Sequence, residues 1–185
     1  MQTARPNERR KDTRMTPAPL RTTHAFSGTY TQEQTKTHRW HTFTVPAGAT
    51  SIDLRLSFSP ERVGPFSNKL TITLFDPNGF RGEGHRGGAL HEAHVACDGA
   101  TPGYLPGRLP AGEWTVRINA QAALQSEPLL TYTLQVAVSS AAAGDRPVLW
   151  APPPERVLAR QAGWFRGELH SHTNHSDGHW TLHEM

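Results

Sequence analysis

The chain has 185 residues, of which 36% are hydrophobic, 16 are glycine and 15 are proline. This length is enough for one well-packed core and the start of a second, and the composition points to many turns. No stretch approaches the roughly 20 apolar residues of a transmembrane helix, and the charged start MQTARPNERRKDTRMTPAP lacks the apolar segment of a secretory signal. We therefore expect a cytoplasmic protein that does not enter a membrane.

The formal net charge of +3 is unevenly distributed. Residues 1–21 contain six basic and two acidic residues, whereas the rest of the chain contains 13 basic and 14 acidic residues and is nearly neutral. Residues 1–21 are therefore predicted to form a disordered basic tail, and a nearly neutral body argues against nucleic acid as the main partner. Cys97 is the single cysteine, so an intrachain disulfide is excluded, and it is predicted to be a small buried residue.

Residues 22–140 show apolar side chains at every second position, which is typical of strands with one buried and one solvated face. The runs are Phe43–Val45, Ile52–Phe58, Leu70–Leu74, Trp114–Ile118 and Tyr132–Val138. Between them lie turn sequences such as VPAGA, DPNG and LPAGE. Many strands without intervening helices predict a mainly β fold, namely an antiparallel β-sandwich of jelly-roll type.

Two stretches inside this region resemble functional motifs only superficially. HEAH, at His91–His94, lacks the spacing of the zinc-binding HExxH helix, and its histidines should not share a face. GFRGEGHRGG, at Gly79–Gly88, is rich in glycine but does not lie between a strand and a helix, as a phosphate-binding loop would. Both stretches are predicted to be surface loops.

Residues 141–163 include Gly144 and three consecutive prolines, so they are predicted to be a linker. Residues 164–185 form a segment of different character. A strand from Trp164 to Thr173 would place His170 and His172 on one side, where both imidazoles can reach the same cation. Asp177 follows in the turn sequence SDG, and Thr181 with Glu184 forms the capping-box pattern of a helix start.

His170, His172 and Asp177 are therefore predicted to be metal ligands, and this mixture of imidazole and carboxylate suits zinc, manganese or iron. A strand, a ligand-bearing loop and a helix start would make the first βα element of an α/β barrel, with its ligands at the end of the strand. One such element cannot bury its own strand, so we expect the rest of that domain beyond this sequence. The alternative is a histidine-rich surface tail that binds metal only adventitiously.

The stretch from Glu168 to Gly178, ELHSHTNHSDG, resembles the first motif of the PHP (polymerase and histidinol phosphatase) superfamily, DLHxHTxxSDG. A β-sandwich and a proline-bearing linker before this motif resemble the CehA/McbA-type metallohydrolases. The resemblance implies a PHP-type barrel with two or three divalent metal ions, acting on phosphoester, carbamate or related ester bonds of a small molecule. It makes His170, His172 and Asp177 metal ligands, and Glu168 stands where the family usually has Asp. His175 is then either an outer hydrogen-bond partner or a solvated loop histidine. The later ligands and catalytic residues of the family are not in this sequence.

A second hypothesis is that the β-sandwich is a carbohydrate- or protein-binding module without catalysis. Trp40, Trp114 and Tyr104 are the candidate stacking residues, although Trp114 is in phase with the apolar positions of its own run. A third hypothesis comes from PHP domains that accompany DNA polymerases, and the neutral body argues against it.

Overall fold

The computed structural model describes most of the chain, namely residues 20–140, 151, 163–164, 166–167, 170–173, 178–181 and 183–185. The tail expected at residues 1–21 therefore lies outside the described residues except for Leu20 and Arg21, which begin the first strand. Most of the linker expected at residues 141–163 also lies outside them. In the part of the chain that is described, no helix is both long and apolar enough to span a membrane.

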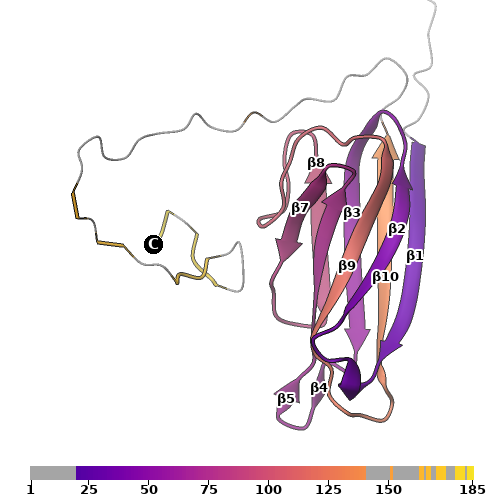
Figure 1. Cartoon of the computed structure of the whole chain (residues 1–185), viewed down its shortest axis with the longest axis vertical. Coiled ribbons are helices and arrows are strands. Elements are labelled where there is room, and N and C mark those ends of the chain that lie inside the picture. The colour runs from indigo at the N-terminus through magenta and orange to yellow at the C-terminus, as the bar shows by residue number, and fades with distance from the viewer. Residues whose placement is uncertain are drawn as a thin grey trace, which may run out of the picture.

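The described residues form two four-stranded antiparallel sheets and one two-stranded hairpin (Figure 1). The first sheet has the order β1 (Leu20–Tyr30), β10 (Leu130–Ser140), β3 (Ala49–Ser59) and β8 (Leu90–Ala96). The second has the order β2 (His38–Val45), β9 (Gly112–Ala122), β6 (Lys69–Asp76) and β7 (Gly79–Gly84). The hairpin consists of β4 (Arg62–Val63) and β5 (Phe66–Ser67), and the short 3-10 helix η1 (Gln32–Gln34) joins β1 to β2.

The eight long strands are paired in a nested way. The first pairs with the last (β1 with β10), the second with the last but one (β2 with β9), and then β3 with β8 and β6 with β7. The chain is therefore a long double strand folded over on itself, which is the connectivity of a jelly roll. The predicted mainly β fold with antiparallel sheets is confirmed.

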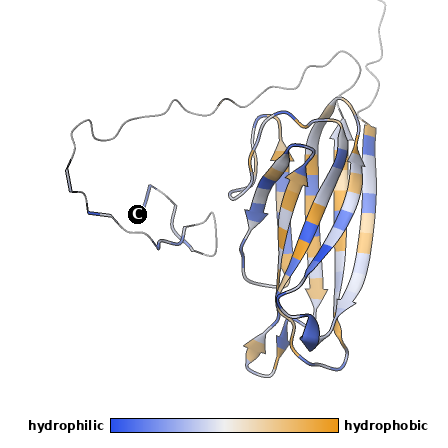
Figure 2. Ribbon diagram, viewed as in Figure 1, coloured by the Kyte–Doolittle hydropathy of each residue, from blue (hydrophilic) through white to orange (hydrophobic). Residues whose placement is uncertain are grey.

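One hydrophobic core contains side chains of both sheets. Apolar and polar residues alternate along the strands (Figure 2), so that Ile52, Leu54 and Leu56 of β3 are each at most 2% exposed. Trp114 of β9 is fully buried in the same cluster. Burial of each such side chain stabilises the fold by about 1.5–3 kcal/mol. Cys97 is buried as predicted.

The prediction of a surface loop is wrong in part for both stretches, because each contains strand residues. HEAH lies within β8, where His91 is 3% exposed and His94 points to the opposite, solvated face. The first six residues of GFRGEGHRGG form β7. Its glycines permit close packing rather than a loop: a Cβ on Gly82 would lie 2.4 Å from the Cα of Tyr104.

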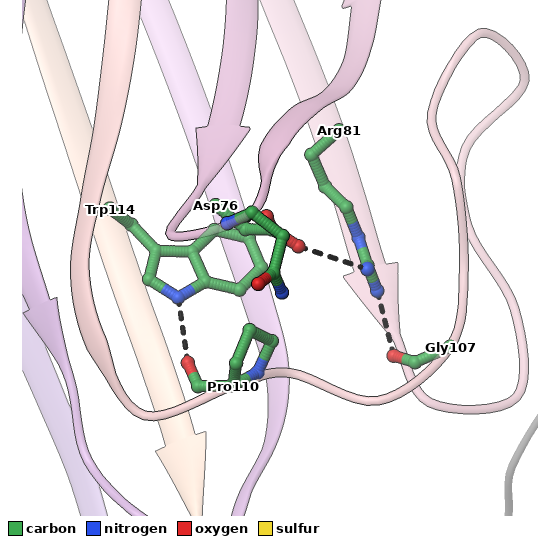
Figure 3. A network of polar contacts seen from close by, with 6 residues as sticks. Asp76, Arg81, Gly107, Pro110 and Trp114 are labelled. Carbon is green, nitrogen blue, oxygen red and sulfur yellow. Dashed lines mark hydrogen bonds and ion pairs between the residues drawn. The ribbon is translucent and has the colours of Figure 1, made fainter.

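The long connection between β8 and β9 is attached to the second sheet by a network of buried polar contacts (Figure 3). The guanidinium of Arg81 forms an ion pair with Asp76 at 3.3 Å and donates a hydrogen bond to the carbonyl of Gly107 at 2.8 Å. The indole N–H of Trp114 donates to the carbonyl of Pro110 at 2.8 Å. The Asp76 and Arg81 side chains are only 7% and 12% exposed, so this connection is anchored by charges inside the fold.

Candidate functional site

The imidazoles of His170 and His172 come together in the structure. Their Nε2 atoms are 3.0 Å apart and their rings are stacked with centroids 5.1 Å apart. Two nitrogens that each bind one cation at about 2.0–2.1 Å, with an angle of about 90–110° between them, are separated by about 2.9–3.4 Å. The observed separation is therefore that of two ligands of one metal ion, and it is also that of a hydrogen bond between the rings.

The strand expected from Trp164 to Thr173 is not shown by the structure. Residues 163–164, 166–167 and 170–173, the described part of that segment, lie in no strand. A strand is stable only when it pairs with other strands in a sheet. The first βα element of a barrel therefore stays a prediction, although the two histidines meet without it.

Gly178 lies close against the backbone of His172 and Thr173. Its N–H donates to the carbonyl of Thr173 at 3.0 Å. A Cβ on Gly178 would lie 2.2 Å from the carbonyl oxygen of His172, a distance that no real Cβ can adopt. Only glycine fits here, which is a physical reason for the glycine of the SDG sequence. Asp177 and His175 lie outside the described residues.

Thr181 and Glu184 form half of the predicted capping box. The carboxylate of Glu184 accepts hydrogen bonds from the backbone N–H of Thr181 at 2.7 Å and from its hydroxyl at 2.8 Å. These bonds, with the backbone bond first, lower the pKa of Glu184. The N–H of Glu184 donates to the carbonyl of Thr181 at 3.1 Å rather than to the Thr181 hydroxyl. The pair therefore forms a turn that has one of the two capping-box hydrogen bonds, from the Thr181 N–H to the Glu184 carboxylate.

The described residues do not by themselves complete a metal site. Among them, no group of three or more His, Cys, Asp or Glu side chains is arranged to hold a metal ion. The histidine pair contributes two nitrogens, and the predicted third ligand, Asp177, is not among the residues that the structure places.

The three side chains proposed to stack on a ligand differ in their exposure to solvent. Trp114 is 0% and Tyr104 6% exposed, so both are core residues and the proposal is wrong for them. Their polar atoms are already used: the Tyr104 hydroxyl donates to the carbonyl of Ile72 at 3.2 Å, and the Trp114 indole to Pro110. Trp40 is 56% exposed on the outer face of the second sheet. The sequence contained the signal for this, because Trp40 is out of phase with the buried Phe43 and Val45 of the same strand.

The outer face of the second sheet also carries a dense polar cluster that the sequence analysis missed. Thr71 and Thr73, expected on a solvated face, are both 0% exposed because longer side chains of β9 lie over them. Asn119 donates to both threonine hydroxyls at 3.2 and 3.0 Å, and Arg117 donates to Thr73 at 3.2 Å. The polar residues at alternate positions of β9 can be recognised in the sequence. Their contacts with the threonines of β6 cannot, because these depend on the pairing of two strands far apart in the sequence.

The sequence matches no model of a known protein family, and a search among curated proteins finds no similar sequence. The resemblance to the PHP superfamily therefore rests on the motif from Glu168 to Gly178 and on the β-strand region and proline-bearing linker before it.

Proposed function

We propose that this chain is the amino-terminal part of a metal-dependent hydrolase of the PHP type, in which His170, His172 and Asp177 bind the first metal ion. The observation that carries the proposal is the 3.0 Å separation of the two imidazole Nε2 atoms. The remaining ligands of a centre with two or three metal ions would be supplied by residues outside these 185. We expect the present chain to bind metal weakly and to have little or no catalytic activity.

The chemistry of the donor set supports this proposal. Two neutral imidazoles and a carboxylate suit zinc, manganese or iron, whereas magnesium and calcium prefer oxygen ligands. The close approach of Gly178 to the carbonyl of His172 supports it as well, because it fixes the backbone on which the second imidazole is carried.

A divalent cation bound by these residues would lower the pKa of a coordinated water and stabilise the charge that develops on the leaving oxygen of the substrate. The proposed substrates are small molecules with a phosphoester, carbamate or related ester bond. In this chain, the histidines would hold the cation through their neutral imidazole nitrogens.

The metal site can be tested on the present chain with Co²⁺, whose visible absorption reports nitrogen coordination. We expect His170→Ala and His172→Ala each to weaken Co²⁺ binding at least tenfold, and His183→Ala, which removes a histidine of the same segment, to leave it unchanged. Gly178→Ala should also weaken binding although it removes no ligand, whereas Gly167→Ala, where a Cβ meets no atom within 4 Å, should not. Equal binding by the wild type and the two histidine variants would refute the metal site.

The hydrolase activity is tested on the complete protein with a panel of phosphomonoesters, phosphodiesters and carbamates. We expect two or three bound metal ions per chain, loss of turnover on treatment with a chelator, and loss of turnover in His172→Ala. Unchanged hydrolysis by His172→Ala would end the proposal. Metal binding without hydrolysis of any ester in the panel would leave the cation site but remove the hydrolase.

A further inference from the structure

The outer face of the second sheet combines exposed aromatic rings with a hollow lined by polar side chains. The register of the strands places Trp40, Arg117, Thr73 and Glu83 in one row across β2, β9, β6 and β7. All four side chains leave the sheet on the side away from the core, since Val116 and Ile118, next to Arg117 in the chain, are buried within it. This face is independent of the histidine pair.

The aromatic part of the face consists of three rings, two of which lie against one guanidinium. Trp40 and Phe75 lie with ring centroids 5.6 Å apart, and Phe75 and Phe80 with centroids 6.1 Å apart in an edge-to-face arrangement. The guanidinium of Arg117 lies 5.4 Å from the ring centres of both Trp40 and Phe75. Trp40 and Phe80 are nevertheless 56% and 57% exposed. Two large aromatic side chains are thus held in fixed positions and left accessible, which is a feature of surfaces that bind a partner.

The polar part is a hollow of about 350 Å³ that adjoins the aromatic rings at Arg117. It is lined by residues of β9 and β7, by the first residue of β2 and by the turn before it, namely Gln121, Asn119, Arg117, Glu83, His38 and Lys36. Small-molecule sites in proteins measure about 300–1,000 Å³, so this hollow is at the small end of that range.

The floor of this hollow has hydrogen-bonding capacity that its neighbours do not use. Asn119 is 5% exposed; its Nδ2 donates to Thr71 and Thr73, while its Oδ1 has no hydrogen-bond partner within the described part of the chain. Rotating the amide by 180° would only exchange which end lacks a partner. Buried polar atoms are nearly always satisfied in folded proteins, so an unsatisfied amide below a hollow indicates a ligand group or a water at that place.

We propose that this face binds a neutral oligosaccharide, with one pyranose ring stacked on Trp40 and hydroxyl groups of the neighbouring ring in the hollow. One face of a pyranose presents C–H groups, which are attracted by the electron-rich face of an aromatic ring. Its hydroxyls both donate and accept, and the lining offers the Lys36 ammonium as a donor and the Asn119 Oδ1 and the Glu83 carboxylate as acceptors.

The charges of this face favour a neutral ligand over an anionic one. Arg117 is already engaged with two aromatic rings and with Thr73. Lys36 and Glu83 then leave one charge of each sign in the hollow, and the carboxylate of Glu83 would repel a ligand carboxylate or phosphate. A second hollow, of about 510 Å³, lies on the outer face of the first sheet, but it has no aromatic lining. Its polar side chains pair with one another: Arg55 forms an ion pair with Glu92 at 2.8 Å, and the His94 imidazole is hydrogen-bonded to Asp53 at 2.7 Å.

The proposal is tested with the whole 185-residue chain on an array of neutral and anionic oligosaccharides, followed by calorimetric titration of the glycans that bind. We expect neutral glycans to be retained. Their binding should be unaffected by a chelator and by about 0.5 M salt, which screens exposed charges. Trp40→Ala should reduce the affinity at least tenfold, and Gln121→Ala should reduce it less. Phe66→Ala removes an aromatic ring that is 67% exposed on β5, outside this face, and should leave the affinity unchanged.

Circular dichroism of each variant establishes that the fold is retained, which is expected because Trp40 and Gln121 are not core residues. Failure of the wild type to retain any glycan would overturn the proposal, as would equal affinity of Trp40→Ala and wild type. Retention of anionic glycans or single-stranded DNA alone, lost at high salt, would identify an electrostatic surface and would likewise overturn it.

Discussion

Replacing Asp76 by asparagine should destabilise the sandwich strongly although the two side chains have nearly the same shape. Asp76 pairs with Arg81 at 3.3 Å, and the two side chains are 7% and 12% exposed. With an effective dielectric constant of about 20, unit charges about 4 Å apart attract by about 4 kcal/mol. Loss of one partner of a buried ion pair typically costs about 3–5 kcal/mol, because the other charge stays buried without compensation.

In this variant Arg81 keeps its hydrogen bond to the carbonyl of Gly107 and its position 5.7 Å from the ring centre of Trp114. We therefore expect the free energy of unfolding to fall by about 3 kcal/mol, the lower end of that range. Single domains unfold with about 5–15 kcal/mol, so this is a large fraction of the stability. For a domain of this size it corresponds to a fall in Tm of about 10 °C. The measurement is urea unfolding followed by circular dichroism, with the slope against urea expected to be unchanged.

The matched control is Glu92→Gln, which removes a carboxylate from an ion pair whose side chains are 55% and 59% exposed. It should cost less than about 1 kcal/mol because exposed pairs are screened by solvent. Combining Asp76→Asn with Arg81→Met should cost less than the sum of the two single changes, since neither charge is left alone. A loss below about 1 kcal/mol for Asp76→Asn, or strict additivity in the double variant, would refute this reasoning.

Three further changes test other parts of the fold. Gly82→Ala should lower the free energy of unfolding by at least about 3 kcal/mol, because the backbone has a φ of +135° and the Cβ would meet the backbone of Tyr104. Gly87→Ala, with open space around it, should stay within about 0.5 kcal/mol of the wild type, and thermal unfolding compares the two variants. Tyr30→Phe should stabilise the fold by about 1 kcal/mol at pH 7, since the buried hydroxyl lacks a partner within the described residues. Burial raises the pKa of Tyr30 from 10.0 to about 12, so the unfolded chain loses this proton first, and the stability of the wild type should fall between pH 10 and about 12. The fall should be less steep in Tyr30→Phe, which keeps Tyr104, whose pKa burial also raises. Burial lowers the pKa of His91 below 6.5, so the unfolded chain takes up this proton first and stability should fall as the pH drops below 6.5; an equally steep acid loss in His91→Gln would contradict this assignment.

The parts of the fold that could be predicted are those written in local patterns. Ile52, Leu54 and Leu56 alternate with polar residues, and each is buried as the period of a strand requires. Trp114 could be assigned to the core because it shares the phase of Val116 and Ile118. By contrast, the sequence predicts loops at β7 and in β8. Glycine is a weak strand former, and these strands are decided by packing against Tyr104 and by pairing with β6 and β3.

The two candidate sites also differ in how far they depend on local sequence. His170 and His172 were identified from their spacing, and the structure brings their nitrogens together, because residues two apart in the sequence are always near in space. The face around Trp40 was only partly foreseen. Trp40 itself was named, but Phe75, Phe80 and Asn119 lie on other strands, and only the strand register places them beside it.

The sequence by itself determined the β class, the turns, the buried face of most strands and the histidine pair, because each depends on residues within a few positions of one another. The tertiary structure alone decided that β1 pairs with β10, that Asp76 and Arg81 are buried together with the connection between β8 and β9, and that aromatic and polar side chains meet on the second sheet. Strand pairing is cooperative over long separations, and the free energy of each pair depends on what the other strands already cover, so no local pattern records it.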